Sequence, residues 1–246
     1  SGLRAAMLAA RGFTGIEDVL EASYGGFLSA IARTPKPERL LAGLGESWET
    51  LNVGFKMYPS VTSIHSALDA LRGLMAAHAL TADSIERIEV GVGHMTFVHT
   101  AWPYRPQGVT AAQMNMFFGL AAIALGGDGS AADYRERRLA DPAILGFIPR
   151  IAVHEDSEIE AMGPAFRHAC HMVVHTRDGR ALRQEVLHRR ASPENPVGAA
   201  EVAAKFRTSV RDLLSRAEQD EVIGVVAGLE TQDDLAPLGA LLGAAR

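Results

Sequence analysis

The sequence predicts an α+β protein, with helices toward both ends of the chain and strands in its middle. Apolar residues recur at the spacing of one helical face in residues 62–80, 111–125 and 199–217. Residues 84–99 instead read as a strand, in which Ile85, Ile88, Val90 and Val92 recur as apolar residues do in a half-buried strand. Residues 166–190 read as two strands around the turn dipeptide Asp178–Gly179, which predicts an antiparallel hairpin.

Composition limits the possible classes of protein. The 246 residues are 48% hydrophobic and 22% charged, which is typical of a globular protein with one large or two small domains. A net charge of −5 and the lack of a basic run argue against a nucleic-acid partner. The one cysteine, Cys170, excludes an intramolecular disulfide. With neither a membrane-spanning run nor a signal peptide visible, we expect a cytoplasmic protein that has no membrane partner.

The elements follow one another with recognisable joins. Residues 1–50 predict three short helices, near 1–10, 17–22 and 27–32, and then a segment rich in proline and glycine, so a domain boundary is expected near Asn52. Residues 101–108 form a proline-containing loop that carries Arg105, and the following helix ends at two glycines. Residues 148–156 predict a further strand, and the tail from residue 199 is helical again.

The stretch from Lys56 to Arg72 concentrates residues suited to chemistry. Pro59 ends one element, and Thr62 and Ser63 read as caps of the next helix. His65 lies off the apolar stripe of that helix, with Asp69 four residues later, so the carboxylate could orient the imidazole. Lys56 and the free N–H groups of the first helical turn suit a carboxylate ligand. The alternative is that His65 is a solvated surface residue.

Three histidines near the hairpin raise the question of a metal site. His168, His171 and His175 share a face only on a helix, whereas the valines between them indicate a strand. On a strand, His171 and His175 point to one side about 13 Å apart, and His168 points to the other. One metal ion cannot be bound at that separation. The sequence therefore predicts no metal site and no cofactor.

Four stretches of the chain resemble motifs of the MmgE/PrpD family, in the family's order. The first is a lysine, an aromatic residue and a proline, followed six residues later by a histidine that opens a helix with an Asp-Ala pair. Here these residues are Lys56, Tyr58, Pro59, His65, Asp69 and Ala70. The other stretches lie at residues 11–21, 108–118 and 192–207, so the resemblance spans essentially the whole chain.

The resemblance implies an all-helical domain, present here in part, and a smaller α+β lid domain with an antiparallel sheet. Residues 1–51 and 192–246 then belong to the helical domain and residues 52–191 to the lid. It also implies a homodimer and a small di- or tricarboxylate substrate. The implied chemistry is proton abstraction next to a carboxylate without a metal, first of all by a 2-methylcitrate dehydratase-type lyase, with a decarboxylase or an epimerase as alternatives.

Such chemistry needs a base and cationic donors that hold the carboxylates. The catalytic candidates are His65, which the resemblance places in the pocket, and Lys56. The candidates for substrate binding are Tyr58, Arg105 and Asp69.

Two features depart from the family pattern. The chain opens inside a helix near the middle of the family's usual length, and Phe118 stands where related decarboxylases often have a tyrosine, which argues against decarboxylation. A non-catalytic or truncated family member therefore stays open as an alternative. We expect the 246 residues alone not to turn over a carboxylate substrate.

Overall fold

The computed structural model describes residues 1–244, which divide into one compact unit at Ser1–Thr50 and a second from Leu51 onward. The first unit contains α1 (Gly2–Ala9), α2 (Phe27–Ile31) and a 3-10 turn, η1 (Pro37–Arg39). The helix predicted near residues 17–22 is a series of turns. Among the described residues of this unit, no apolar side chain is buried. The predicted domain limits stay predictions.

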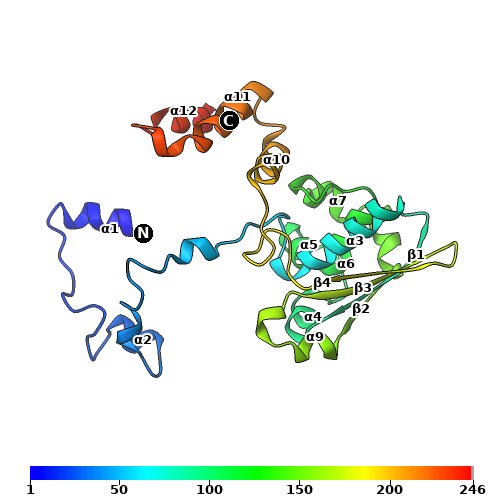
Figure 1. The fold of residues 1–246 in the computed structure, drawn as a ribbon, viewed down its shortest axis with the longest axis horizontal. Coiled ribbons are helices and arrows are strands. Elements are labelled where there is room, and N and C mark those ends of the chain that lie inside the picture. Colours follow the sequence, from blue (N-terminus) through cyan, green and yellow to red (C-terminus); the bar gives the residue numbers. More distant parts are fainter. Residues whose placement is uncertain (245–246) are drawn as a thin grey trace. The chain divides into compact units, whose positions relative to one another are not determined.

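The second unit is built on a four-stranded sheet in the order β2-β1-β3-β4 (Figure 1). Its strands are β1 (Ile85–Val92), β2 (Ile151–Glu155), β3 (Cys170–Thr176) and β4 (Ala181–Val186). The predicted hairpin is confirmed, since β3 and β4 pair antiparallel around Asp178 and Gly179, and β3 also pairs antiparallel with β1. The α+β class is confirmed as well.

The expectation of a purely antiparallel sheet is wrong, because β2 runs parallel to β1. A parallel pair needs a long crossover between its strands, and the helices between Val92 and Ile151 supply it. The sequence pattern of β2 predicted a strand but carried no information about its direction.

One face of the sheet is covered by α3 (His65–His78) and α6 (Met116–Ala124) (Figure 1). The core between these layers is largely apolar, with Leu68 and Leu71 of α3, Phe118 of α6 and Ile88 and Val90 of β1 all at most 1% exposed. Cys170 of β3 also faces this core at 1% exposure, and burial raises the pKa of its thiol.

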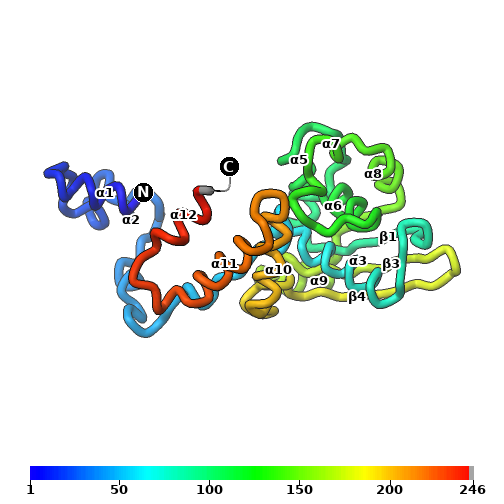
Figure 2. The backbone as a smooth tube through the Cα atoms, turned by 90° about the horizontal axis from the view of Figure 1, so that it is seen from above, coloured from blue at the N-terminus to red at the C-terminus, as the bar shows by residue number. Residues whose placement is uncertain are grey.

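The remaining helices of this unit lie between the strands along the chain or follow β4. The segment after β1, read from sequence as a continuing strand, turns at Gly93 into a helix of seven residues, α4. Figure 2 shows the chain leaving the hairpin of β3 and β4 and continuing into the last three helices. No helix in residues 1–244 combines the length and apolarity that a membrane crossing requires. The bounds are α4 (His94–Thr100), α5 (Val109–Met114), α7 (Glu136–Leu139), α8 (Pro142–Phe147), α9 (Ser157–Ala161), α10 (Ala199–Val210), α11 (Arg216–Ala227) and α12 (Ala236–Ala244), with 3-10 turns η2 (Glu49–Asn52), η3 (Thr62–Ile64), η4 (Ala131–Tyr134), η5 (Ile148–Arg150), η6 (Pro164–Phe166) and η7 (Leu229–Thr231).

Candidate functional site

Lys56 and His65 meet at the carbonyl oxygen of Ser60. Lys56 Nζ donates a hydrogen bond to this oxygen at 3.3 Å, and His65 Nε2 lies 3.3 Å from it. The loop is fixed in place because Val61 N donates to the carbonyl oxygen of Gln113 at 2.9 Å, after which η3 leads directly into α3. The structure therefore brings together the two residues predicted to be catalytic.

The hydrogen bond to Ser60 determines which nitrogen of His65 carries the hydrogen. A carbonyl oxygen only accepts, so Nε2 donates and the neutral ring presents a lone pair at Nδ1. Nδ1 is buried and has no hydrogen-bond partner among residues 1–244. An imidazole nitrogen in that state can accept a proton from a ligand that reaches it.

His65 is 0% exposed, so the alternative of a solvated surface histidine is wrong. Burial lowers the pKa of His65 to about 4, because the imidazolium form loses hydration, and the nearby charges of Arg189 and Lys56 lower it further against the effect of the Ser60 carbonyl. The ring packs edge-on against Tyr58, with ring centres 5.2 Å apart. His65 is therefore a neutral base at neutral pH.

Asp69 does not orient His65, contrary to the expectation from their spacing. Its Oδ1 accepts a 2.6 Å hydrogen bond from the hydroxyl of Tyr58, and its Oδ2 accepts one from the backbone N–H of Arg190 at 3.1 Å. Tyr58 lies between the two groups, with its ring against His65 and its hydroxyl on Asp69. Burial and the Asp69 charge raise the pKa of Tyr58, which keeps its hydroxyl protonated.

A basic cavity adjoins this cluster. It has a volume of about 490 Å³, and its lining includes Arg167, His168, His188 and Arg189, with Glu194 as the acidic residue. Arg189 also contacts the residue before Lys56, since its Nη1 donates to the carbonyl oxygen of Phe55 at 2.8 Å. Burial lowers the pKa of His168 to about 4, with further contributions from Arg167 and Arg189. A cavity with this lining suits an anionic ligand.

Sequence reasoning missed two residues of this cavity. The sequence placed His168 on a strand, yet it precedes β3, and its Nδ1 is buried without a partner in the described part of the chain. Arg189 lies just beyond β4 and is one of the charges that act on His65. The run His188–Arg190 at the end of a predicted strand was the available signal.

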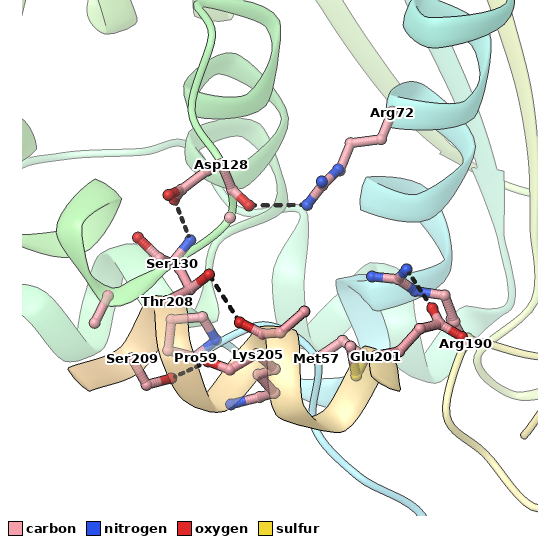
Figure 3. A pocket seen from close by; sticks show the side chains of 13 residues that line it. Met57, Pro59, Arg72, Asp128, Ser130, Arg190, Glu201, Lys205, Thr208 and Ser209 are labelled. Carbon is pink, nitrogen blue, oxygen red and sulfur yellow. Dashed lines mark hydrogen bonds and ion pairs between the residues drawn. The ribbon is translucent and has the colours of Figure 1, made fainter. Parts of the chain in front are cut away.

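A second cavity, of about 270 Å³, lies between α10 and the loop around Asp128 (Figure 3). In Figure 3 Arg72 points toward Asp128 and Arg190 toward Glu201. Arg72 Nη1 donates to the carbonyl oxygen of Asp128 at 2.8 Å, and Arg190 forms an ion pair with Glu201 at 2.9 Å. Its two arginines are thus occupied and two acidic residues line it, so the first cavity is the better anion site.

Two other residues singled out from the sequence line neither cavity. Arg105 is exposed in the loop between α4 and α5. Phe118 is 0% exposed and packs between Tyr104 and Tyr134, at 5.0 and 5.5 Å between ring centres, so it is a core residue.

A family model described as the MmgE/PrpD C-terminal domain matches residues 58–231. The cis-aconitate decarboxylase-like protein oryM of Aspergillus oryzae is 29% identical, and a cis-aconitate decarboxylase of Aspergillus terreus is 25% identical, each over 98% of this chain and 52% of the relative. The mouse cis-aconitate decarboxylase is 22% identical over 98% of this chain and 50% of its own length. The chain thus spans about half the length of these relatives.

Proposed function

Because the chain belongs to the MmgE/PrpD family, we propose that it supplies the carboxylate-binding and proton-transfer groups of a lyase for small di- or tricarboxylates. The observation that carries this proposal is the neutral, buried His65, whose free Nδ1 lies within reach of the charges of Lys56 and Arg189. This arrangement combines a base with cations, as a reaction next to a carboxylate requires.

The proposed roles follow from the charges. Lys56 and Arg189 bind carboxylate groups of the substrate and stabilise the negative charge that develops on the neighbouring carbon. His65 Nδ1 takes up the proton that leaves this carbon. In a decarboxylation, carbon dioxide leaves and the electron pair left on carbon takes up a proton instead. A bound polycarboxylate raises the pKa of His65, so the same imidazole can carry that proton and donate it.

Decarboxylation of a cis-aconitate-type substrate is the first candidate reaction. Its support is the similarity to relatives that are named as cis-aconitate decarboxylases or as decarboxylase-like. Dehydration of a 2-methylcitrate-type substrate is the second candidate. The uncharged state of His65 favours it, because dehydration starts with a base.

We further propose that this chemistry needs no metal. The charges of Lys56, Arg167 and Arg189 gather at the basic cavity and its neighbour His65, and they can neutralise two or three carboxylates. Turnover is then unchanged after treatment with a chelator.

Ligand binding by the 246-residue chain is the direct test. Calorimetric titration with cis-aconitate or the stable analogue tricarballylate should show binding that weakens about tenfold or more in Lys56→Ala and Arg189→Ala, because a charge-assisted hydrogen bond is lost. Arg189→Lys keeps the positive charge and should bind better than Arg189→Ala. Lys205→Ala is the matched control, since Lys205 lines the second cavity. Loss of binding in Lys205→Ala alone would move the site to that cavity and overturn the proposal.

Turnover is the second test. The chain is assayed alone and with the first half of the A. oryzae relative supplied as a second chain, because its relatives are about twice as long. Release of carbon dioxide from cis-aconitate identifies the decarboxylase, and loss of water from 2-methylcitrate identifies the dehydratase. Binding without turnover in either assay would favour the non-catalytic alternative.

A further inference from the structure

The face of the sheet that points away from the core carries a row of residues crossing all four strands. Gly91 of β1 is paired with His154 of β2 on one side and with His171 of β3 on the other, and His171 is paired with Glu185 of β4. Paired residues of neighbouring strands point to the same face. Since Gly91 has no side chain, a gap opens between the two imidazoles.

Asp156, which follows β2, reaches into this gap. Its Oδ2 lies 2.8 Å from Nδ1 of His171. A Cβ atom placed on Gly91 would lie 2.6 Å from Asp156 Oδ2 and 3.1 Å from His154 Nε2. The side chains of Asp156 and His154 therefore both approach the backbone of Gly91, and Asp156 also contacts His171.

Glu158 lies close to Asp156 and His171. The ligand atoms of Asp156, Glu158 and His171 all lie within 4.8 Å of one another. Two ligands held by one zinc ion at ~2.1 Å in tetrahedral geometry are about 3.4 Å apart. The 2.8 Å between His171 Nδ1 and Asp156 Oδ2 therefore needs to widen by about 0.6 Å to admit an ion.

The charge around this gap favours a cation. Five acidic residues cluster at this end of the sheet, namely Glu155, Asp156, Glu158, Glu160 and Glu185. Within residues 1–244, their side-chain oxygens bond to the imidazoles of His94 and His171 and to backbone N–H groups rather than to lysine or arginine. The exposed Arg183 lines the same cavity on this face of the sheet as Asp156, His171 and Glu185. One positive charge against five acidic residues leaves the cluster with a negative excess.

We propose that Asp156, Glu158 and His171 bind a divalent transition-metal ion such as Zn²⁺, with His154 or water as the fourth ligand. An imidazole nitrogen and carboxylate oxygens form a donor set that suits such ions. The ion takes the place of the proton between His171 Nδ1 and Asp156 Oδ2. Glu185 Oε2 lies 2.9 Å from His171 Nε2, so it accepts the remaining N–H and orients the ligating ring.

This site is different from the three-histidine arrangement that the sequence excluded. His175 points to the same face as His171 but pairs with Glu89, 3.0 Å away, and His168 lines the basic cavity instead. The ligands of the proposed site come from the end of β2 and from β3, which are brought together only by the pairing of both strands with β1. A metal here links the start of α9 to β3 and has no part in the proposed reaction.

The test is calorimetric titration of the metal-free chain with ZnCl₂, with Co²⁺ absorption as a report of the ligand geometry. We expect one Zn²⁺ per chain, a rise of the melting temperature, and binding at least about tenfold weaker in Glu158→Gln, Asp156→Asn and His171→Gln. Asp156 also caps α9, and asparagine preserves the cap, so Asp156→Asn separates ligation from folding. His175→Gln is the control on the same strand and face, and should bind within twofold of the native chain.

Absence of saturable Zn²⁺ binding would overturn the proposal. Equal weakening in His175→Gln and His171→Gln would overturn it too, because the histidines would then bind metal without a defined site. Far-ultraviolet circular dichroism of each variant shows whether it is folded, and a variant that is folded and keeps native affinity removes its residue from the ligand set. If all three keep native affinity, no site exists here.

Discussion

The hydroxyl of Tyr58 donates a 2.6 Å hydrogen bond to Asp69 while the ring of the same tyrosine packs edge-on against His65. Tyr58 is 2% exposed and the Asp69 side chain 15%, so the bond is largely shielded from bulk water. Tyr58→Phe leaves one oxygen of Asp69 without its donor, and we expect the free energy of unfolding to fall by about 1–2 kcal/mol in urea denaturation. Tyr24→Phe is the control, because Tyr24 is 94% exposed. Equal stability of the native and Tyr58→Phe chains would show that the bond contributes nothing.

His65→Gln should lower kcat of the active assembly by about a hundredfold or more, because an amide cannot take up the proton. His65→Ala should in addition reduce stability. Although His65 lies off the apolar stripe of its helix, it is 0% exposed and its removal opens a cavity. His99→Gln, at an exposed position of α4, is the control. Turnover within twofold of native in His65→Gln would exclude a proton-transfer role.

Stability should fall as the pH drops from about 6.5 toward 4. The unfolded chain takes up a proton on His65 near its ordinary pKa of 6.5, whereas the folded chain takes it up only at about 4, because burial disfavours the charged ring. Between pH 6.5 and 4, proton uptake by His65 therefore stabilises the unfolded state relative to the folded state, by up to about 3 kcal/mol. The free energy of unfolding, measured by urea denaturation at each pH, should fall less steeply with decreasing pH in His65→Gln than in the native chain. The same pH dependence in both chains would contradict the lowered pKa of His65.

Gly91→Ala and Gly73→Ala should have opposite effects. A Cβ on Gly91 meets Asp156 Oδ2 at 2.6 Å, so we expect a loss of about 1–3 kcal/mol and weaker Zn²⁺ binding. Gly73 lies exposed inside α3 with open space around it, so alanine there should stabilise the chain by about 0.5–1 kcal/mol. Thermal denaturation of the two variants measures both effects. A neutral Gly91→Ala would show that Asp156 moves aside freely.

We expect the chain to associate with itself, as the family resemblance implies for a homodimer. The first unit exposes apolar side chains on α1, including Leu3 at 78% and Met7 at 50%. Light scattering after gel filtration should give twice the mass of the chain, with and without a chelator. A monomer at all concentrations would contradict this prediction, and a dimer that a chelator dissociates would contradict a metal-free interface.

Most of the second unit could be predicted from local patterns. The apolar spacing of α3 and α6, the alternation in β1 and the Asp178–Gly179 turn each specify one element through nearby residues. The direction of β2 and the existence of α4 could not be predicted in the same way. The first depends on the crossover between two strands, and the second was hidden because the sequence after Gly93 continued to read as a strand.

The candidate site, too, could be predicted only in part from local sequence. Lys56 and His65 are nine residues apart, so a proline and a helix start were enough to predict that they meet. His168 and Arg189 lie more than one hundred residues further along the chain and reach the site only through the ends of β3 and β4. The burial of His65 was also unpredictable, because the loop before α3 covers the first turn and no pattern within the helix encodes it.

The position of Cys170 in the core makes the native chain suited to site-directed labelling. Its thiol is the only one in the sequence, is 1% exposed, and has a pKa raised by burial, so maleimide reagents should leave it unmodified. Exposed positions such as Tyr24 and Arg105 can then be changed to cysteine, one in each unit, without first removing the native thiol. Fluorescent dyes on that pair would report the distance between the two units in solution, and any change in it on adding cis-aconitate.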